Sequence, residues 1–139
     1  MVDKDIVMEK AGNIRRCLSR INDTTQNSPD SLFDIDIQDI FVLNLQRAIQ
    51  SALDLAAHII ADDSLGFPTT LREHFQILAQ ENIITHDLSQ SMQAMVGFRN
   101  IAVHEYQNIE VAILQGILKN HLSDLENFYQ SIFDYYRII

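Results

Sequence analysis

The sequence predicts an all-α fold, an up-and-down bundle of about five helices, and three observations support this prediction. Hydrophobic residues make up 47% of the 139 positions, whereas glycine and proline are scarce, which is unlike a turn-rich β fold. Apolar residues recur at three- and four-residue steps, the period of a helix with one buried face. The polar runs Asn22–Asp30 and Asp62–Pro68 are too short to separate domains. We therefore expect one helical domain over residues 1–139.

The first helix is expected over residues 3–21 and is unusually basic. Its apolar stripe includes a lone cysteine, Cys17, which excludes an internal disulfide and is interpreted as a core residue in a reducing compartment. Residues 1–20 hold five basic against three acidic residues, a net charge of +2, whereas the remaining 119 residues carry −11. The five basic residues are Lys4, Lys10, Arg15, Arg16 and Arg20. They form either a solvated helix face or a contact surface for nucleic acid or an acidic partner.

A long second helix is expected from a cap at Asp30 or Ser31 through Ala61. Beside its apolar stripe runs a line of polar residues at three- and four-residue spacing. The members of this line are Arg47, Gln50, Asp54 and His58. Two interpretations stay open: an exposed Asp54–His58 pair with an isolated arginine, or Arg47 and Asp54 facing a functional cluster on a later helix.

Three further helices follow. Thr70 and Glu73 form a capping-box pattern ahead of a short helix that ends near Asn82. Thr85 is expected to cap the fourth helix, which runs to about Asn108. The apolar stripe from Val111 to Tyr136 predicts one last helix of about thirty residues, roughly 45 Å if straight. Its aromatic end is expected to dock onto the first helix or to form a partner surface.

The stretch RNIAVHEY, Arg99–Tyr106, lies near the end of the fourth predicted helix. Arg99 interrupts an apolar face, and a buried guanidinium must meet a carboxylate, a carbonyl or a bound anion. At about 100° per residue, His104 lies roughly 140° from Arg99, whereas Tyr106 shares the Arg99 face. Either the helix loosens near Val103, or Arg99 and His104 converge with copies from a second subunit.

The stretch begins with an arginine and a polar residue and has a histidine five positions after the arginine. This pattern resembles the Rx4-6H signature of the HEPN superfamily of metal-independent ribonucleases. With Tyr106, the stretch resembles HepT toxins, and the similarity extends over Asn44–Ile60 and Leu71–Phe98. This resemblance implies a HEPN-type homodimer with a composite cleft. It also implies a toxin ribonuclease of a type VII-like toxin–antitoxin system, with RNA as its substrate.

The resemblance also assigns roles to individual residues. Arg99 and His104 are implied as the catalytic pair, with Asn100, Arg47 and Asp54 in support. Tyr106 resembles the hydroxyl that receives AMP from an MntA-type nucleotidyltransferase antitoxin. Its structural alternative is a helix-end tyrosine whose hydroxyl sits at the rim of an apolar face.

The side-chain chemistry of Arg99 and His104 also fits RNA cleavage without a metal, independently of the resemblance. RNA cleavage without a metal needs a base for the 2′-hydroxyl, an acid for the leaving 5′-oxygen and positive charge on the phosphate. His104 can transfer protons near neutral pH, and Arg99 offers a permanent forked donor. One histidine does not readily serve as acid and base at once, which favours two copies in one cleft.

Charge and composition narrow the other possibilities. A net charge of −9 repels long nucleic acid, so no DNA partner is expected. No signal peptide and no apolar run of membrane-spanning length is present, so a cytoplasmic protein without membrane contact is expected. Scattered histidines and the absence of HExxH or CxxC predict no metal site and no cofactor. Two alternatives remain: a non-catalytic nucleotide- or partner-binding module, and a structural dimer with an internal Arg99–Asp54 ion pair.

Overall fold

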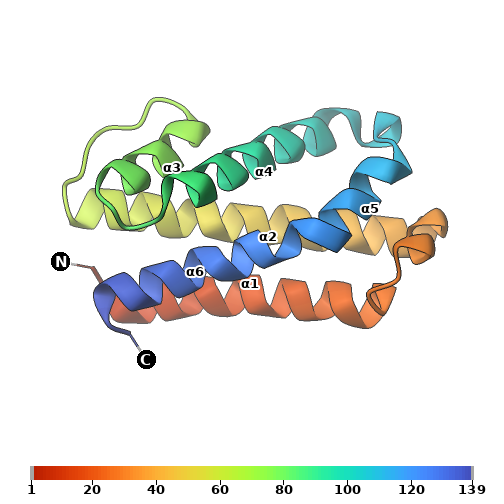
Figure 1. The fold of residues 1–139 in the computed structure, drawn as a ribbon, viewed down its shortest axis with the longest axis horizontal. Coiled ribbons are helices and arrows are strands. Elements are labelled where there is room, and N and C mark those ends of the chain that lie inside the picture. The colour runs from red at the N-terminus through yellow and green to blue at the C-terminus, as the bar shows by residue number, and fades with distance from the viewer. Residues whose placement is uncertain (1, 139) are drawn as a thin grey trace.

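The computed structural model describes residues 2–138, apart from the side chain of Gln107. These residues form an all-α bundle, as predicted (Figure 1). The described part contains six α-helices and two short 3-10 helices, rather than about five helices. In chain order they are α1 (Lys4–Thr25), η1 (Pro29–Phe33), α2 (Ile35–Asp62), α3 (Leu71–Gln80), α4 (His86–Glu105), η2 (Tyr106–Asn108), α5 (Val111–Asn120) and α6 (Leu122–Tyr136).

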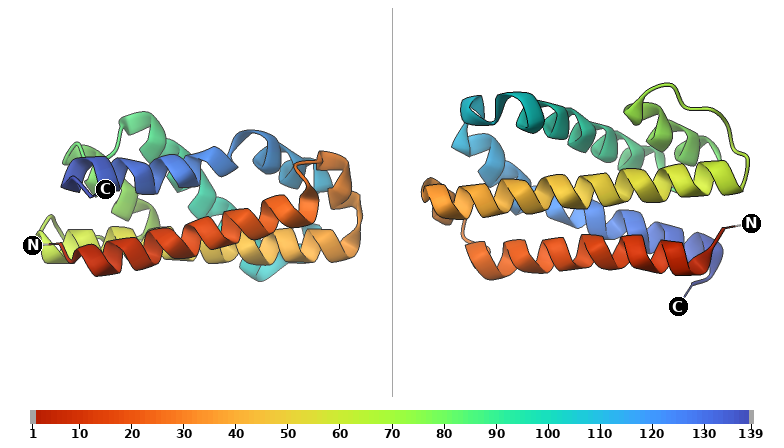
Figure 2. Two further views of the ribbon diagram at one scale, coloured as in Figure 1. Left: turned by 90° about the horizontal axis from the view of Figure 1, so that it is seen from below. Right: turned by 180° about the vertical axis from the view of Figure 1, so that it is seen from behind.

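The two longest helices, α1 and α2, lie side by side and antiparallel, as the two views in Figure 2 show. Each begins at an aspartate whose carboxylate accepts backbone N–H groups of the first turn: Asp3 for α1 and Asp34 for α2. The predicted cap of α2 at Asp30 or Ser31 is wrong. Pro29 begins the separate turn η1, and extended backbone at Asp34 precedes the true start of α2.

Helix α2 lies at the centre of the bundle and packs against α1, α3, α4 and α6. Its apolar residues from Phe41 to Ile60 are mostly buried, and α3 joins α6 through an edge-to-face contact between Phe75 and Phe128 at 5.4 Å. Cys17 is half-buried and packs against the core, in line with its predicted role. No buried side-chain nitrogen or oxygen among the described residues lacks a hydrogen-bond partner.

The prediction of a single long last helix is wrong, because the helix is interrupted at His121 between α5 and α6 (Figure 1). His121 has φ −125° and ψ −10°, outside the helical range. The two segments pack on different neighbours: α5 on η1, and α6 on α1, α2 and α4. A straight helix could not satisfy both contacts. The aromatic end of α6 packs against α1, as expected, and Tyr136 also donates a hydrogen bond to Asp63 at the end of α2, at 2.7 Å.

Candidate functional site

Helix α4 carries the Arg99–Tyr106 stretch and is anchored at its start. The Thr85 hydroxyl accepts the backbone N–H of Leu88 at 3.1 Å, which confirms the predicted cap. The buried Ser89 hydroxyl donates to the backbone carbonyl of Phe75 at 3.0 Å and fixes α4 on α3. The helix then continues without a break to Glu105, so loosening near Val103, the first of the two alternatives, does not occur.

The half-buried Arg99 points toward α2. Its Nη2 donates to Gln50 Oε1 at 2.8 Å, and its Nη1 lies 3.5 Å from Asn100 Oδ1. A carbonyl oxygen therefore meets the guanidinium, one of the three partners that the sequence allowed. Gln50 was not assigned this contact from sequence, although its place in the polar line of α2 was the signal for it.

Gln50 links Arg99 to a charged pair formed by Lys10 of α1 and Asp54 of α2. Its Nε2 donates to Asp54 Oδ1 at 2.9 Å, and Lys10 Nζ lies 3.6 Å from Asp54 Oδ2. Asp54 therefore faces the Arg99 cluster through Gln50. Among the described residues, Arg99 itself makes no ion pair, which argues against an internal Arg99–Asp54 bridge.

The Asp54–His58 pair, part of one of the two interpretations left open, is not formed, because His58 has other partners. His58 Nε2 lies 3.4 Å from Asp62 Oδ2 and accepts the backbone N–H of Asp3 at 3.2 Å. The partner of His58 is therefore Asp62, one turn further along α2. The imidazole of His58 also connects the start of α1 to the end of α2.

His104 lies on the same helix as Arg99 but in a different environment. Its side chain is exposed and makes no hydrogen bond or ion pair within the described part of the chain. Two apolar neighbours on α4, Ile101 and Val103, are also 51% and 54% exposed. A single chain therefore does not bring the imidazole to the guanidinium.

Tyr106 begins η2 and returns to α2. Its hydroxyl donates to Asp39 Oδ1 at 2.5 Å and lies 3.3 Å from Gln38 Oε1. Burial, together with the hydrogen bond and negative charge of Asp39, raises the pKa of the Tyr106 phenol above its usual value. The ring is partly buried against the core with its hydroxyl at the rim, as the structural interpretation expected.

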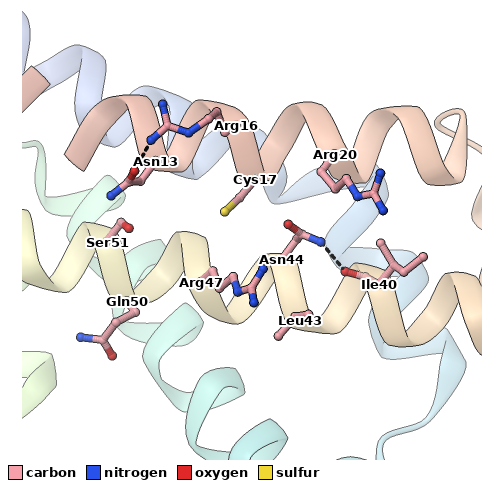
Figure 3. Close-up of a pocket in the computed structure, with 10 residues that line it drawn as sticks. All are labelled: Asn13, Arg16, Cys17, Arg20, Ile40, Leu43, Asn44, Arg47, Gln50 and Ser51. Atoms are coloured by element: carbon pink, nitrogen blue, oxygen red, sulfur yellow. Dashed lines mark hydrogen bonds between the residues drawn. The ribbon is translucent and has the colours of Figure 1, made fainter. Parts of the chain in front are cut away.

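A groove of about 640 Å³ lies between α1 and α2, next to Gln50 (Figure 3). Its lining residues are Asn13, Arg16, Cys17, Arg20, Ile40, Leu43, Asn44, Arg47, Gln50 and Ser51. Arg47 lines this groove with two arginines of α1. Burial raises the pKa of the Cys17 thiol, and the charges of Arg47 and Arg16 partly oppose that shift. The sequence pattern did not reveal that these arginines gather across two helices.

No described helix is long and apolar enough to cross a membrane. Within residues 2–138, no three side chains of His, Cys, Asp or Glu gather as metal ligands would.

Solved structures of relatives share this fold. The structure described as a tri-AMPylated Shewanella oneidensis HEPN toxin in complex with MNT antitoxin is 39% identical, with a TM-score of 0.88 over 94% of this chain and 98% of that one. A toxin–antitoxin structure with AMP-PNP is also 39% identical, with a TM-score of 0.87 and the same coverage. The cytosolic protein YutE from Bacillus subtilis, only 18% identical, has a TM-score of 0.83 over 96% of this chain and 90% of its own, a likeness of fold alone.

Sequence comparison gives the same family. The mRNA nuclease HepT of Shewanella oneidensis is 40% identical over 124 residues, which cover 89% of this chain and 93% of that protein. The family model described as Ribonuclease HepT-like matches residues 14–132. The chain therefore belongs to the HepT-like ribonucleases, the HEPN toxins of MntA–HepT toxin–antitoxin pairs.

Proposed function

We propose that this protein is a toxin that cleaves RNA without a metal ion, through Arg99 and His104. Membership of the HepT-like family and the likeness to an mRNA nuclease support the reaction class. The observation that carries the proposal is the unbroken helix α4, which holds a permanent cation and a solvent-exposed imidazole five residues apart. Cleavage of a phosphodiester needs a group that transfers protons and a group that stabilises the negative charge on the phosphate.

The proposed active site is composite, formed where the α4 ends of two copies meet. On one straight helix, Arg99 and His104 point roughly 140° apart, so one copy cannot direct both at the same phosphate. Ile101 and Val103, each about half exposed beside His104, supply apolar surface that a second copy would cover. Pairing would bring two imidazoles and two guanidiniums into one cleft.

In this cleft, one His104 accepts the proton of the 2′-hydroxyl as its oxygen attacks phosphorus. The bond to the 5′-oxygen breaks, and the second His104, protonated, donates to that oxygen. The products are a 2′,3′-cyclic phosphate and a 5′-hydroxyl. Arg99 stabilises the charge that develops on the phosphate, an effect typically worth several kcal/mol. Asn100, at the Arg99 guanidinium, is proposed to orient the substrate.

We further propose that an MntA-type nucleotidyltransferase antitoxin silences the protein by adding AMP to Tyr106. Support comes from the relative described as tri-AMPylated in complex with its MNT antitoxin. The Tyr106 oxygen attacks the α-phosphate of ATP, pyrophosphate leaves, and the phenol loses its proton. Asp39, which already accepts the hydrogen bond from this hydroxyl, can receive that proton. The new phosphate and adenosine would obstruct RNA beside Arg99.

Cleavage of RNA by wild type, Arg99→Ala and His104→Ala tests the nuclease. We expect each substitution to lower the rate at least about 100-fold with the helical circular dichroism signal intact, and EDTA to leave wild type unchanged. Loss of activity on chelation, or full activity in His104→Ala, would reject the mechanism. Protein that binds nucleotide but never cuts RNA would identify a non-catalytic binding module instead.

Two copies joined in one chain test the composite site. A tandem dimer with His104→Ala in only one half should lose at least about 100-fold in rate, because one imidazole cannot serve as acid and base together. A tandem dimer with Tyr135→Phe in one half is the control, since that exposed tyrosine lies on α6. Half of the wild-type rate in the single-histidine dimer would show that each histidine works alone.

Mass spectrometry after incubation with the antitoxin and ATP tests the modification. Wild type and Tyr135→Phe should gain AMP on Tyr106, and Tyr106→Phe should gain none. An unmodified Tyr106 in a fully inhibited complex would show that binding alone silences the toxin.

A further inference from the structure

We propose that the groove between α1 and α2 binds the sugar–phosphate backbone of single-stranded RNA, with Arg16, Arg20 and Arg47 as its phosphate contacts. This subsite extends the proposed nuclease site and rests on that proposed function. It assigns two arginines of the basic first helix, Arg16 and Arg20, to the RNA substrate.

The first argument is uncompensated charge. The protein carries −9, yet none of the ten residues that line the groove is acidic. Arg16 donates to the amide oxygen of Asn13, and no carboxylate of the described residues pairs with Arg16, Arg20 or Arg47. Three cations on one groove repel one another, and a bound polyanion would remove that repulsion. The acidic remainder of the surface would keep RNA from binding elsewhere.

The second argument is the way the two helices present these side chains. Figure 3 shows Arg16 and Arg20 on α1 and Arg47 on α2, with the Cys17 thiol pointing from α1 toward α2. Arg16 and Arg20 are one helical turn apart, about 6 Å along the axis. Arg16 of α1 and Arg47 of α2 both line the groove with Cys17, and the charges of both lower the pKa of its thiol against the effect of burial. A strand lying in the groove would meet cations on both sides.

The third argument is the mixed chemistry of the groove. Leu43 is 45% exposed and lies with Ile40 on the α2 side, where bases can pack. Asn44 uses its amide nitrogen on the Ile40 carbonyl at 2.9 Å, which leaves its amide oxygen for a base edge. Proteins that bind single-stranded nucleic acid combine a cationic groove with flat surfaces on which bases stack, and in this groove the arginine guanidinium planes supply such surfaces.

The fourth argument is continuity with the proposed active site. Gln50 lines the groove and also accepts the hydrogen bond from Arg99 at 2.8 Å. Arg47 lies three residues before Gln50 on α2, about 4.5 Å along the helix. A strand whose scissile phosphate reached Arg99 would therefore enter the groove within about one nucleotide. A protein partner would gain nothing from this continuity, although arginine is also common at protein interfaces.

Binding of a short single-stranded RNA with methylated 2′-hydroxyls, which cannot be cleaved, tests the subsite by fluorescence anisotropy. The groove variant combines Arg16→Gln, Arg20→Gln and Arg47→Gln. The control variant combines Arg15→Gln, Arg72→Gln and Arg137→Gln, three exposed arginines outside the groove, and keeps the same net charge. Circular dichroism and urea unfolding verify that both variants are folded.

We expect the groove variant to bind at least about 10-fold more weakly than wild type at about 100 mM salt, and the control less than about 3-fold. Across about 50 to 200 mM salt, the slope of log Kd against log salt should fall by about 2 in the groove variant, since each lost phosphate contact removes about 0.7. Unchanged binding in the groove variant, or equal weakening in both variants, would overturn the assignment.

Parallel measurements separate the remaining outcomes. A groove variant that keeps its RNA affinity but loses the antitoxin complex or the dimer would show that the groove docks protein. If wild type cleaves unmodified RNA and the groove variant binds RNA as tightly as wild type, only the subsite is refuted. Groove-dependent binding by a wild type that never cleaves RNA would refute only the nuclease.

Discussion

Two valines on α4 differ only in what lies opposite them. Val96 and Val103 are seven residues apart, two turns of one helix, and point within about 20° of each other. Val96 is 1% exposed and Val103 is 54% exposed. Helical periodicity gives the direction of a side chain, but it does not say whether the same chain covers it. The second half of α4 thus presents apolar surface that its own bundle leaves open.

Met92 and Arg99 are separated by the same seven residues. Met92 is fully buried, whereas Arg99 is half-buried and donates to Gln50. The change from apolar to polar chemistry along one face therefore coincides with the loss of neighbours. The first half of α4 is covered by its own bundle, whereas the second half keeps Phe98 and Ala102 buried but leaves Ile101 and Val103 about half exposed.

The largest expected effect separates the two valines by stability. Val96→Ala removes two buried methyl groups and should lower the free energy of unfolding by about 2 kcal/mol. Val103→Ala should change it by less than about 0.5 kcal/mol in the monomer. Urea denaturation at low protein concentration measures both with the same chemical change.

Raising the protein concentration sharpens this test. If a second copy covers the end of α4, Val103→Ala should become destabilising only where the dimer forms, while the effect of Val96→Ala should stay constant. Equal losses at both positions in the monomer would contradict the division of α4 into two halves.

Most of the features that were predicted correctly depend on near neighbours along the chain, although the cap of α2 was placed at Asp30 or Ser31 rather than at Asp34. The caps at Thr70 and Thr85 follow from local hydrogen bonding, and both were confirmed. That Arg99 would meet a carboxylate, a carbonyl or an anion followed from the cost of burying an unpaired guanidinium, but which of these partners it meets did not.

The missed features depend on contacts between distant segments. The break at His121 arises because α5 and α6 pack on different elements, and an unbroken apolar stripe carries no sign of it. The groove arginines lie on two helices whose relative rotation the sequence pattern does not give. The link from Gln50 to Arg99 spans 49 residues and depends on how α2 crosses α4.

A smaller effect is expected at Tyr106. Tyr106→Phe removes the hydrogen bond to Asp39 and should lower the free energy of unfolding by about 1 kcal/mol at neutral pH. Because the folded state raises the pKa of this phenol, the contribution is complete below the unfolded pKa of about 10 and is lost as pH rises above it. Wild type and variant should therefore converge in stability above about pH 10. A difference that grows in alkali would contradict the assigned hydrogen bond.

The smallest effect is expected at Gln50, the residue of α2 that accepts the hydrogen bond from Arg99 of α4. Gln50→Ala breaks the hydrogen bonds to Arg99 and Asp54, but water can replace them at this exposed side chain, so the loss should be about 0.5 kcal/mol. Gln46→Ala is the matched control, because Gln46 lies one turn earlier on α2 and its side chain makes no hydrogen bond to the described residues. A difference between the two variants above about 2 kcal/mol would make Arg99 a structural residue, since only a guanidinium buried without a partner is that costly. A small difference would leave Arg99 free to exchange Gln50 for a phosphate.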